Sequence, residues 1–256
     1  ALIMTDGSLM AKEIYVHNAP LGKLSQLKGV GEKRKEKEIV RETLSPVRIE
    51  GLIEATYLSD CLVEAAGETI KSTLCISIDD AVVHGIPIDG YLKEGQIVGI
   101  DCGTNFKGFY GDSARTFAVG EISKEAKKLL DVTRESLYLG IKKVKVGNRI
   151  SDISSSIQMF VEEHGFSVVR EFVGHGIGQS LHEEPQVPNY GKPGFGERLR
   201  EGMVLAIEPM VNSNGPEVKV LQDKWTAVTA DGGYSAHFEH SVAVTANGPW
   251  ILSELN

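Results

Sequence analysis

Cysteine is scarce in this sequence, and a long apolar run is absent. The chain of 256 residues contains three cysteines, Cys61, Cys75 and Cys102. An odd number without the spacing of a zinc cluster argues against a disulfide framework and suits a reducing compartment. No run reaches the roughly 18 apolar residues of a membrane span, and Asp6 interrupts the apolar core that an export signal requires. We therefore expect a cytoplasmic protein with no membrane partner.

Positive charge is also in short supply. The sequence has 27 lysine and arginine residues against 35 aspartate and glutamate residues, a formal net charge of -8 at pH 7. Proteins that bind nucleic acid usually present a basic surface that neutralises phosphates, so we expect no direct nucleic-acid partner. Apolar residues make up 41% of the chain and charged residues 24%, which is ordinary for a globular protein with a sizeable core.

Two helices are expected early in the chain. Residues 1–30 show no clear period and are interpreted as an N-terminal extension. A charged segment over residues 32–44 predicts a short helix that ends before Pro46, because proline disfavours helical geometry in the residue that precedes it. Apolar residues recur at spacings of three, four and seven from Ile49 to Ala66, which predicts a second helix.

A sheet and a second pair of helices follow. Between residues 74 and 119 the apolar period falls to two, which predicts strands. An apolar stripe after Ser123, a candidate N-cap, predicts a helix that extends to Val144. Another helix is expected over residues 151–164, and strand signals resume between residues 167 and 244.

The order helix, helix, sheet therefore occurs twice, and it predicts the architecture. We expect an α+β fold in which residues 31–256 form one domain of two pseudo-symmetric halves, residues 31–120 and 121–256. Helices should cover one face of a mostly antiparallel sheet and leave a cleft between the halves on the other face. The halves share no evident sequence similarity, so this duplication rests on the order of the elements.

Two aspartates stand on neighbouring predicted strands. Alternation places Asp101 on the face opposite Ile100 and Cys102, and Asp112 follows 11 positions later on the next strand. A hairpin that paired the two aspartates directly would hold their Cβ atoms about 5 Å apart. Carboxylates this close repel each other, so one is protonated or a cation lies between them. The alternative is that both are solvated acids on a two-sided sheet.

Two glutamates interrupt apolar strands later in the chain. Glu208 lies in the segment MVLAIEPMV directly before Pro209, which fits only a strand end or edge. Glu239 alternates with Phe238 and shares its face with Ser241. Each glutamate alone could be an exposed residue of a half-solvated sheet, whereas a buried glutamate needs a partner.

A glycine-rich loop supplies histidines. The segment EFVGHGIGQSLHEEP, residues 171–185, places His175 and His182 among glycines that let other atoms approach closely. The alternative is a hydrogen-bonded turn histidine. One histidine with four carboxylates would be neutralised by two divalent ions and favours Mn, Fe(II) or Co over a structural zinc. We therefore expect a two-metal hydrolase, with the candidate ligands Asp101, Asp112, His175, Glu208 and Glu239.

Five ordered motifs closely resemble type I methionine aminopeptidase. They lie between about residues 74 and 252 and read VVHGIP (82–87), DCGTNFKGFYGDSARTF (101–117), GHGIGQSLHEEPQVPNYG (174–191), LAIEPM (205–210) and WTAVTADGGYSAHFEH (225–240). Type II enzymes have a long insertion between the second histidine and the first glutamate, and only 26 positions separate His182 from Glu208. The resemblance implies a pita-bread fold, with helices packed on a curved, mostly antiparallel sheet.

The resemblance also implies a metal-ligand set. Asp112 and Glu239 would bridge two divalent ions, whose identity is Co, Mn, Fe(II) or Zn. Asp101 would chelate one ion, and His175 with Glu208 would complete the site of the other. All five acids and histidines that interrupt the strand and loop patterns are used in this assignment.

Three catalytic residues are implied in the same way. Glu208 would be the general base that takes a proton from the attacking water. His84 would contact the scissile amide or the leaving group, and His182 would hydrogen-bond the oxygen that becomes negative in the transition state. The implied substrates are the N-termini of nascent polypeptides, from which the enzyme would remove the initiator methionine as a monomer near the ribosome.

The substrate pocket is where this chain departs from the family. Cys75 and Trp225 match the expected pocket residues, although both also suit a plain core. Leu181 stands where the family usually has phenylalanine, and GETIKSTL (67–74) replaces an aromatic, glycine-rich segment. The family's N-terminal pattern is not recognisable in residues 1–70.

Three other functions fit the sequence less well. An Xaa-Pro-directed peptidase of the same fold usually carries a large additional N-terminal domain, for which about 70 divergent residues are too few. A catalytically weak pita-bread binding protein would have lost ligands, and all five are present. A phosphate-binding loop is the weakest reading, because GHGIG has no following lysine.

Overall fold

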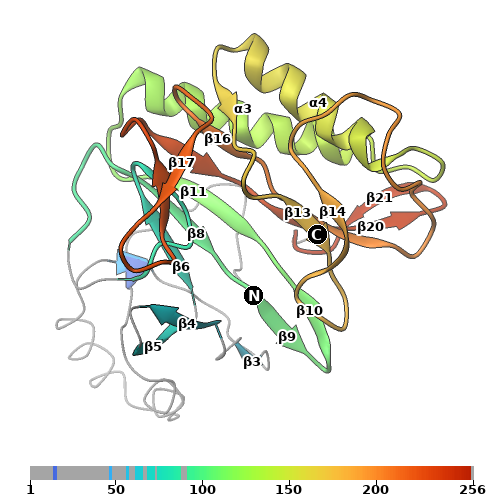
Figure 1. Ribbon diagram of the computed structural model, residues 1–256, viewed down its shortest axis with the longest axis horizontal. Coiled ribbons are helices and arrows are strands. Elements are labelled where there is room, and N and C mark those ends of the chain that lie inside the picture. Colours follow the sequence, from blue (N-terminus) through green and yellow to red (C-terminus); the bar gives the residue numbers. More distant parts are fainter. Residues whose placement is uncertain are drawn as a thin grey trace.

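The computed structural model describes residues 74–87 and 91–254 with their side chains, and before them the backbone of some short strands (Figure 1). These strands are β1 (Ile14–Tyr15), β2 (Pro46–Val47), β3 (Thr56–Tyr57), β4 (Cys61–Ala65) and β5 (Glu68–Ser72). β1 pairs with β2 and β4 with β5, both antiparallel. Apart from β1, the expected extension over residues 1–30 lies outside the described residues, as does the helix expected over residues 32–44.

The helix expected from Ile49 to Ala66 is wrong where the structure describes this range. β3 and β4 occupy part of it, and β4 pairs with β5 from Cys61 opposite Ser72 to Ala65 opposite Glu68. The backbone groups of β4 therefore bond to another strand, which excludes the bonds of a helical turn. In a short apolar run, spacings of three and four do not distinguish a helix from a strand. Here the pairing with β5 determines that the segment is a strand.

The first fully described sheet carries Asp101, one of the predicted metal ligands. Its central strand β8 (Ile97–Asp101) lies between β6 (Cys75–Ile78) and β11 (Ala114–Ala118), and both pairings are antiparallel. A hairpin of β9 (Thr104–Phe106) and β10 (Phe109–Gly111) joins β8 to β11, and β9 also pairs with β3. Asp101 thus ends the central strand.

The two helices of the second half form as the sequence predicts. α3 spans Lys124–Ile141 and α4 spans Ile150–Glu163. Ser123 caps α3, because its Oγ accepts the N–H of Ala126 at 3.0 Å. α4 is followed by Gly165, whose φ of 83° suits the residue after a helix end.

Three antiparallel sheets complete the described chain. Their strand orders are β14-β13-β15-β20-β21, β12-β16-β19 and β17-β18-β7. Because β7 pairs with β18, the last of these sheets joins the first half of the chain to the second. The bounds are β7 (Ala81–Val83), β12 (Ser167–Val168), β13 (Gly174–Gly176), β14 (Glu183–Val187), β15 (Val204–Ile207), β16 (Met210–Asn212), β17 (Val218–Val220), β18 (Ala227–Thr229), β19 (Ser235–His237), β20 (His240–Thr245) and β21 (Gly248–Ile251).

The largest core lies between the helices and the strands. Figure 1 shows α3 and α4 side by side along one side of the strands. Their apolar stripes pack on side chains of β15 and β20, and burial of this apolar surface stabilises the fold; fully buried members include Leu129, Leu137, Ile153, Ile157, Leu205 and Val242. The expected α+β class with mostly antiparallel sheets is confirmed. No helix among the described residues has the length and apolar character to cross a membrane.

The cap of α3 gives a first prediction. Ser123→Ala removes the acceptor for the Ala126 N–H, and we expect it to lower the free energy of unfolding by about 1 kcal/mol. Ser123→Asp keeps an acceptor and should retain most of that stability. Urea denaturation followed by circular dichroism measures both variants, and an equal loss in the two would refute the cap.

Candidate metal centre

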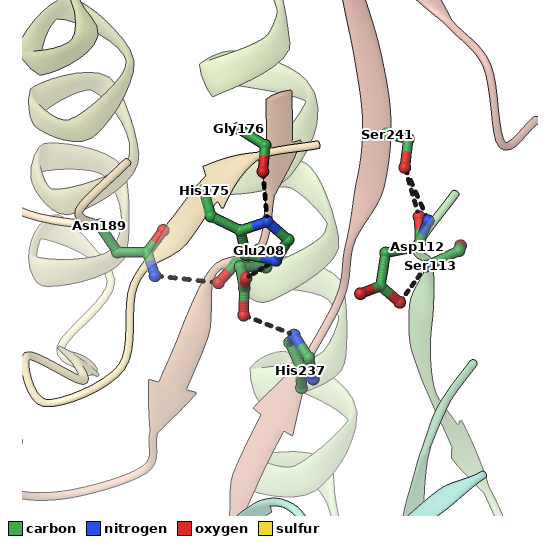
Figure 2. A network of polar contacts seen from close by, with 8 residues as sticks. All are labelled: Asp112, Ser113, His175, Gly176, Asn189, Glu208, His237 and Ser241. Carbon is green, nitrogen blue, oxygen red and sulfur yellow. Dashed lines mark hydrogen bonds and ion pairs between the residues drawn. The ribbon is translucent and has the colours of Figure 1, made fainter. Parts of the chain in front are cut away.

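Asp112 follows β10, and a single hydroxyl group holds its backbone. Its N–H donates to Ser241 Oγ at 2.9 Å, and Ser241 Oγ donates to its carbonyl oxygen at 2.8 Å. The N–H of Ser113 donates to Asp112 Oδ1 at 3.0 Å and orients the carboxyl group (Figure 2). Ser241 belongs to β20, so these bonds attach Asp112 to a strand that lies 129 positions later.

Asp101 and Asp112 meet, but they are not the direct strand partners that the sequence predicts. Lys107 and Gly108, with φ of 53° and 83°, form the two-residue turn of the β9–β10 hairpin. The register that this turn sets places Asp101 opposite Ala114, two residues beyond Asp112. The two carboxyl groups nevertheless share a hydrogen bond.

Asp112 is buried and Asp101 half-buried, and desolvation dominates the ionisation of both. It raises the pKa of Asp101 well above its usual range, and the neighbouring Asp112 and Glu208 carboxyls raise it further. Burial also raises the pKa of Asp112 to about 6, although the nearby His237 opposes this effect. The metal-free site therefore retains protons that exposed carboxyl groups would lose.

His175 lies in β13, between two glycines that its neighbouring strands require. A Cβ atom on Gly174 would lie 2.4 Å from the carbonyl oxygen of Ala206, and one on Gly176 would lie 2.3 Å from that of Glu184. The close packing of β13 against β14 and β15 therefore needs glycine on both sides of the histidine. His175 Nδ1 donates to the carbonyl oxygen of Gly176 at 2.8 Å, which leaves the lone pair of Nε2 facing the site.

Glu208 occupies the break between β15 and β16. Its carbonyl oxygen accepts from Asn189 Nδ2 at 2.9 Å, which fixes the backbone. Its carboxyl group lies between two imidazoles, with His175 Nε2 3.5 Å from Oε1 and His237 Nε2 3.6 Å from Oε2 (Figure 2). Burial, and then the charge of Asp112, raise the pKa of Glu208 well above its usual range.

Glu239 lies between β19 and β20 and completes the cluster. Its side chain is buried, and its Oε1 atom has no hydrogen-bond partner in the described part of the chain. Asp112, His175 and Glu239 each present one potential ligand atom, and these atoms lie within 4.8 Å of one another. Burial raises the pKa of Glu239, and so do the surrounding carboxyl groups, above all Asp112.

The cluster fits a divalent cation. Its oxygen-rich donors are buried or half-buried, where carboxylates cannot all ionise without a compensating charge. The partnerless Glu239 Oε1 and the bare Nε2 of His175 are acceptors that a bound cation would satisfy. The structure thus brings together all five predicted ligands, Asp101, Asp112, His175, Glu208 and Glu239.

His84 follows β7 at the edge of the cluster, in an unusual backbone conformation. Its φ is 60°, and a Cβ on the following Gly85 would lie 2.0 Å from the carbonyl oxygen of Ile76. The ring stacks on Trp225 at 4.6 Å between centroids and meets Phe172 edge-on at 5.3 Å. Burial lowers the pKa of His84 to about 4, so its imidazole is neutral near pH 7.

His182 lies at the rim of the site. Its side chain is exposed, but its ring packs edge-on against His175 with 4.4 Å between centroids. This partial desolvation lowers the pKa of His182. His84 and His182 are near enough for their charges to interact, so two imidazoles flank the carboxylate cluster.

The predicted pocket residues have different places. Trp225 lies against His84, and Cys75 stands opposite Asp101 in the register of β6 with β8. Leu181 is half-buried in the loop between β13 and β14, directly before His182. Cys75 and Trp225 are therefore both adjacent to residues of the cluster.

Sequence reasoning missed three residues at this site. His237 lies two positions before Glu239, and alternation along a strand places such residues on one face, so parity could have found it. Asn189 comes from a loop and reaches the backbone of Glu208, for which no periodic signal exists. Phe172 packs edge-on against His84 from the irregular segment before β13.

Comparison with known sequences gives a consistent family. A sequence model of Metallopeptidase family M24 matches residues 23–246. The chain is similar to a methionine aminopeptidase of Clostridium perfringens, with 58% identity over 182 residues that cover 71% of this chain and 73% of that protein. Methionine aminopeptidase 1 of Bacillus subtilis is 54% identical over 185 residues, or 72% of this chain and 75% of the relative.

Solved structures extend the comparison to the fold. The crystal structure of methionine aminopeptidase from Thermotoga maritima aligns with a TM-score of 0.72 at 50% identity and covers 73% of this chain and 76% of its own. Prolidase from Pyrococcus furiosus aligns with a TM-score of 0.58 at 23% identity and covers 72% of this chain and 49% of its own. At that identity the prolidase shares the fold alone.

The glycines beside His175 give a second prediction. Gly176→Ala forces a Cβ against a strand carbonyl, and we expect it to lower the free energy of unfolding by about 2 kcal/mol or more. Gly178→Ala is the matched control in the same loop, because its Cβ meets only the carboxylate of Glu183 at 3.1 Å. Urea denaturation compares the two variants, and equal stabilities would contradict the requirement for glycine.

The raised carboxyl pKa values give a third prediction, on pH. A carboxyl group whose pKa is higher in the folded than in the unfolded chain stabilises at low pH, and that contribution is lost as pH rises through the folded value. The buried histidines, with ordinary pKa values of 6.5, have the opposite effect below that pH. As pH rises above 6.5, the metal-free protein should therefore become less stable while the carboxyl groups of raised pKa lose their protons.

A divalent ion should remove this pH dependence, because it replaces the protons on the carboxyl groups. Urea denaturation at several pH values, with chelator or with saturating Mn²⁺, measures the effect. Mn²⁺ at 100 times its dissociation constant should add about 2.7 kcal/mol. An identical pH slope with and without Mn²⁺ would rule out a metal at these carboxylates.

Proposed function

This chain belongs to metallopeptidase family M24, and from that membership we propose that it is a methionine aminopeptidase. The pita-bread α+β fold is confirmed by the structural matches. One observation carries the activity, namely the buried cluster of four carboxyl groups and His175 with His84 and His182 beside it. The matched relatives from Clostridium perfringens and Bacillus subtilis, which bear the name methionine aminopeptidase, support the same activity.

The enzyme is a metal-dependent hydrolase, and we infer that it uses two divalent ions. Bound ions supply Lewis acidity and lower the pKa of a coordinated water toward neutrality. Asp112 and Glu239 would be shared between the ions, Asp101 would hold one of them, and His175 with Glu208 would hold the other. The oxygen-rich donor set suits Co, Mn, Fe(II) or Zn, with a preference for the harder ions.

Glu208 is the proposed general base. Its carboxylate accepts a proton from the water that attacks the carbonyl carbon of the first residue, and it returns the proton to the leaving amine. Burial raises its proton affinity, which suits a base near neutral pH. The hydrogen bond from Asn189 Nδ2 to its carbonyl oxygen fixes the backbone that carries this side chain.

His84 and His182 are proposed to handle the substrate amide. His84 is neutral near pH 7 because of burial, so it can hydrogen-bond the scissile amide without adding positive charge. His182, at the open rim, is placed to donate to the carbonyl oxygen as it becomes negative, an interaction that counts most in the transition state. Stacking on Trp225 fixes the ring of His84.

The methionine side chain is proposed to lie against Cys75 and Trp225. Both residues contact or adjoin the cluster, and a flexible thioether adapts well to an irregular apolar wall. Leu181, beside His182, would form the outer wall. The proposed substrates are N-termini of nascent polypeptides, met near the ribosome in the cytoplasm by a monomeric enzyme.

The base assignment gives a fourth prediction. Glu208→Gln should keep the fold and lower turnover of a Met-Ala peptide by about 10³-fold at saturating Mn²⁺, because an amide cannot accept the proton. Glu201→Gln, which removes an exposed carboxylate, is the matched control and should retain full activity. Turnover by the Glu208 variant equal to wild type would sink the assignment.

A peptide panel tests the proposed specificity. Wild-type protein, stripped with chelator and reloaded with Mn²⁺, Fe²⁺ or Co²⁺, is assayed on peptides that begin Met-Ala and Xaa-Pro. We expect cleavage after the methionine only. Cleavage of the Xaa-Pro peptides alone would favour the proline-directed alternative, and cleavage of neither would favour a binding protein.

A further inference from the structure

The ring of His237 is buried at the metal centre without a partner. The residue is 5% exposed, and its Nε2 atom has no hydrogen-bond partner among the described residues. A buried polar atom left unpaired costs free energy, so such an atom usually marks a contact made in another state of the site. Its nearest charged neighbour is Glu208, with Oε2 at 3.6 Å (Figure 2).

The backbone holds this ring in place. The N–H of His237 donates to Thr116 Oγ1 at 2.9 Å, and Thr116 Oγ1 donates to the carbonyl oxygen of His237 at 2.9 Å. His237 also stands opposite Met210 in the pairing of β19 with β16, two positions after Glu208. Contacts on both sides of the strand therefore fix the backbone from which the ring extends toward Glu208.

The two imidazoles beside Glu208 present different groups to it. His175 donates its Nδ1 proton to Gly176, and a ligating imidazole is neutral, so its Nε2 is a bare acceptor opposite Oε1. His175 Nε2 and Glu208 Oε1 are two acceptors 3.5 Å apart, and a cation could bind to both. Nε2 of His237 has no hydrogen-bond partner among the described residues, so the tautomer that carries the proton on Nε2 is available to donate.

We propose that His237 is a positioning residue that donates from Nε2 to Glu208 Oε2, so that Oε1 alone turns toward the cation site beside His175. At 3.6 Å the pair is too long for a hydrogen bond, and a shift of about 0.7 Å in the Glu208 carboxylate brings it to normal length. The proposal rests on the proposed metal-dependent function and adds the group that orients one ligand. Partners that orient metal ligands in this way typically change metal affinity by about 10–100-fold when removed.

Two variants separate the hydrogen bond from the presence of a polar side chain. Glutamine can place an N–H₂ group near the position of Nε2, whereas asparagine is shorter and reaches only the position of Nδ1. We expect His237→Asn to weaken Mn²⁺ binding to metal-free protein about 10–100-fold and His237→Gln to stay within about threefold of wild type. Isothermal titration calorimetry with Mn²⁺ alone measures both, and the effect should fall on one of the two binding steps.

Controls keep the outcome decisive. Thermal denaturation of the metal-free variants checks folding, and His237→Leu, closer in volume to histidine, replaces the asparagine variant if the latter does not fold. Wild-type affinity in the asparagine or leucine variant would overturn the proposal, and so would equal weakening in the glutamine variant. These outcomes do not depend on peptide cleavage, so a failure of the proposed aminopeptidase activity is recognised separately on the Met-Ala substrate.

Discussion

Repulsion among buried carboxyl groups is the constraint on which the described structure depends. Asp101, Asp112, Glu208 and Glu239 come together, and neighbouring carboxyl groups raise the pKa of Asp101, Glu208 and Glu239. Such a cluster persists only because the backbone that carries it is fixed independently. The strand pairings, the Ser241 hydroxyl and the glycines beside His175 provide that rigidity, and a divalent ion supplies the charge that the protein lacks.

The folding information for this site is distributed along the chain. The helices contribute no predicted ligand; α3 and α4 bury the apolar face of the strands and leave the edges and breaks of the sheets to hold the acids. Asp112 follows a strand of the first half, whereas Glu208 and Glu239 interrupt strands of the second. The ligand cluster therefore forms only when strands that are distant in the sequence have paired.

Much of this was predictable from the sequence, and the failures have physical causes. Ser123 and the apolar stripes located α3 and α4 because capping and helical period are local properties. The spacing of apolar residues between Ile49 and Ala66 predicted a helix wrongly, because pairing of β4 with β5 overrides that local signal in the described part of this range. Direct pairing of Asp101 with Asp112 failed because a two-residue turn sets another register. The candidate ligands were predicted from acids that interrupt apolar strands and from the histidine of a glycine-rich loop, whereas Asn189 acts from a loop that has no period.

The Ser241 hydroxyl, which bonds both backbone groups of Asp112, couples the candidate metal centre to the docking of β20 beside the end of β10. One oxygen atom clasps two segments that lie 129 positions apart, so they cannot separate without moving a proposed bridging ligand. Separating the two segments would then weaken binding of the ion, and removing the ion would weaken the contact between the segments. An ion bound at Asp112 would therefore stabilise the docking of these two segments.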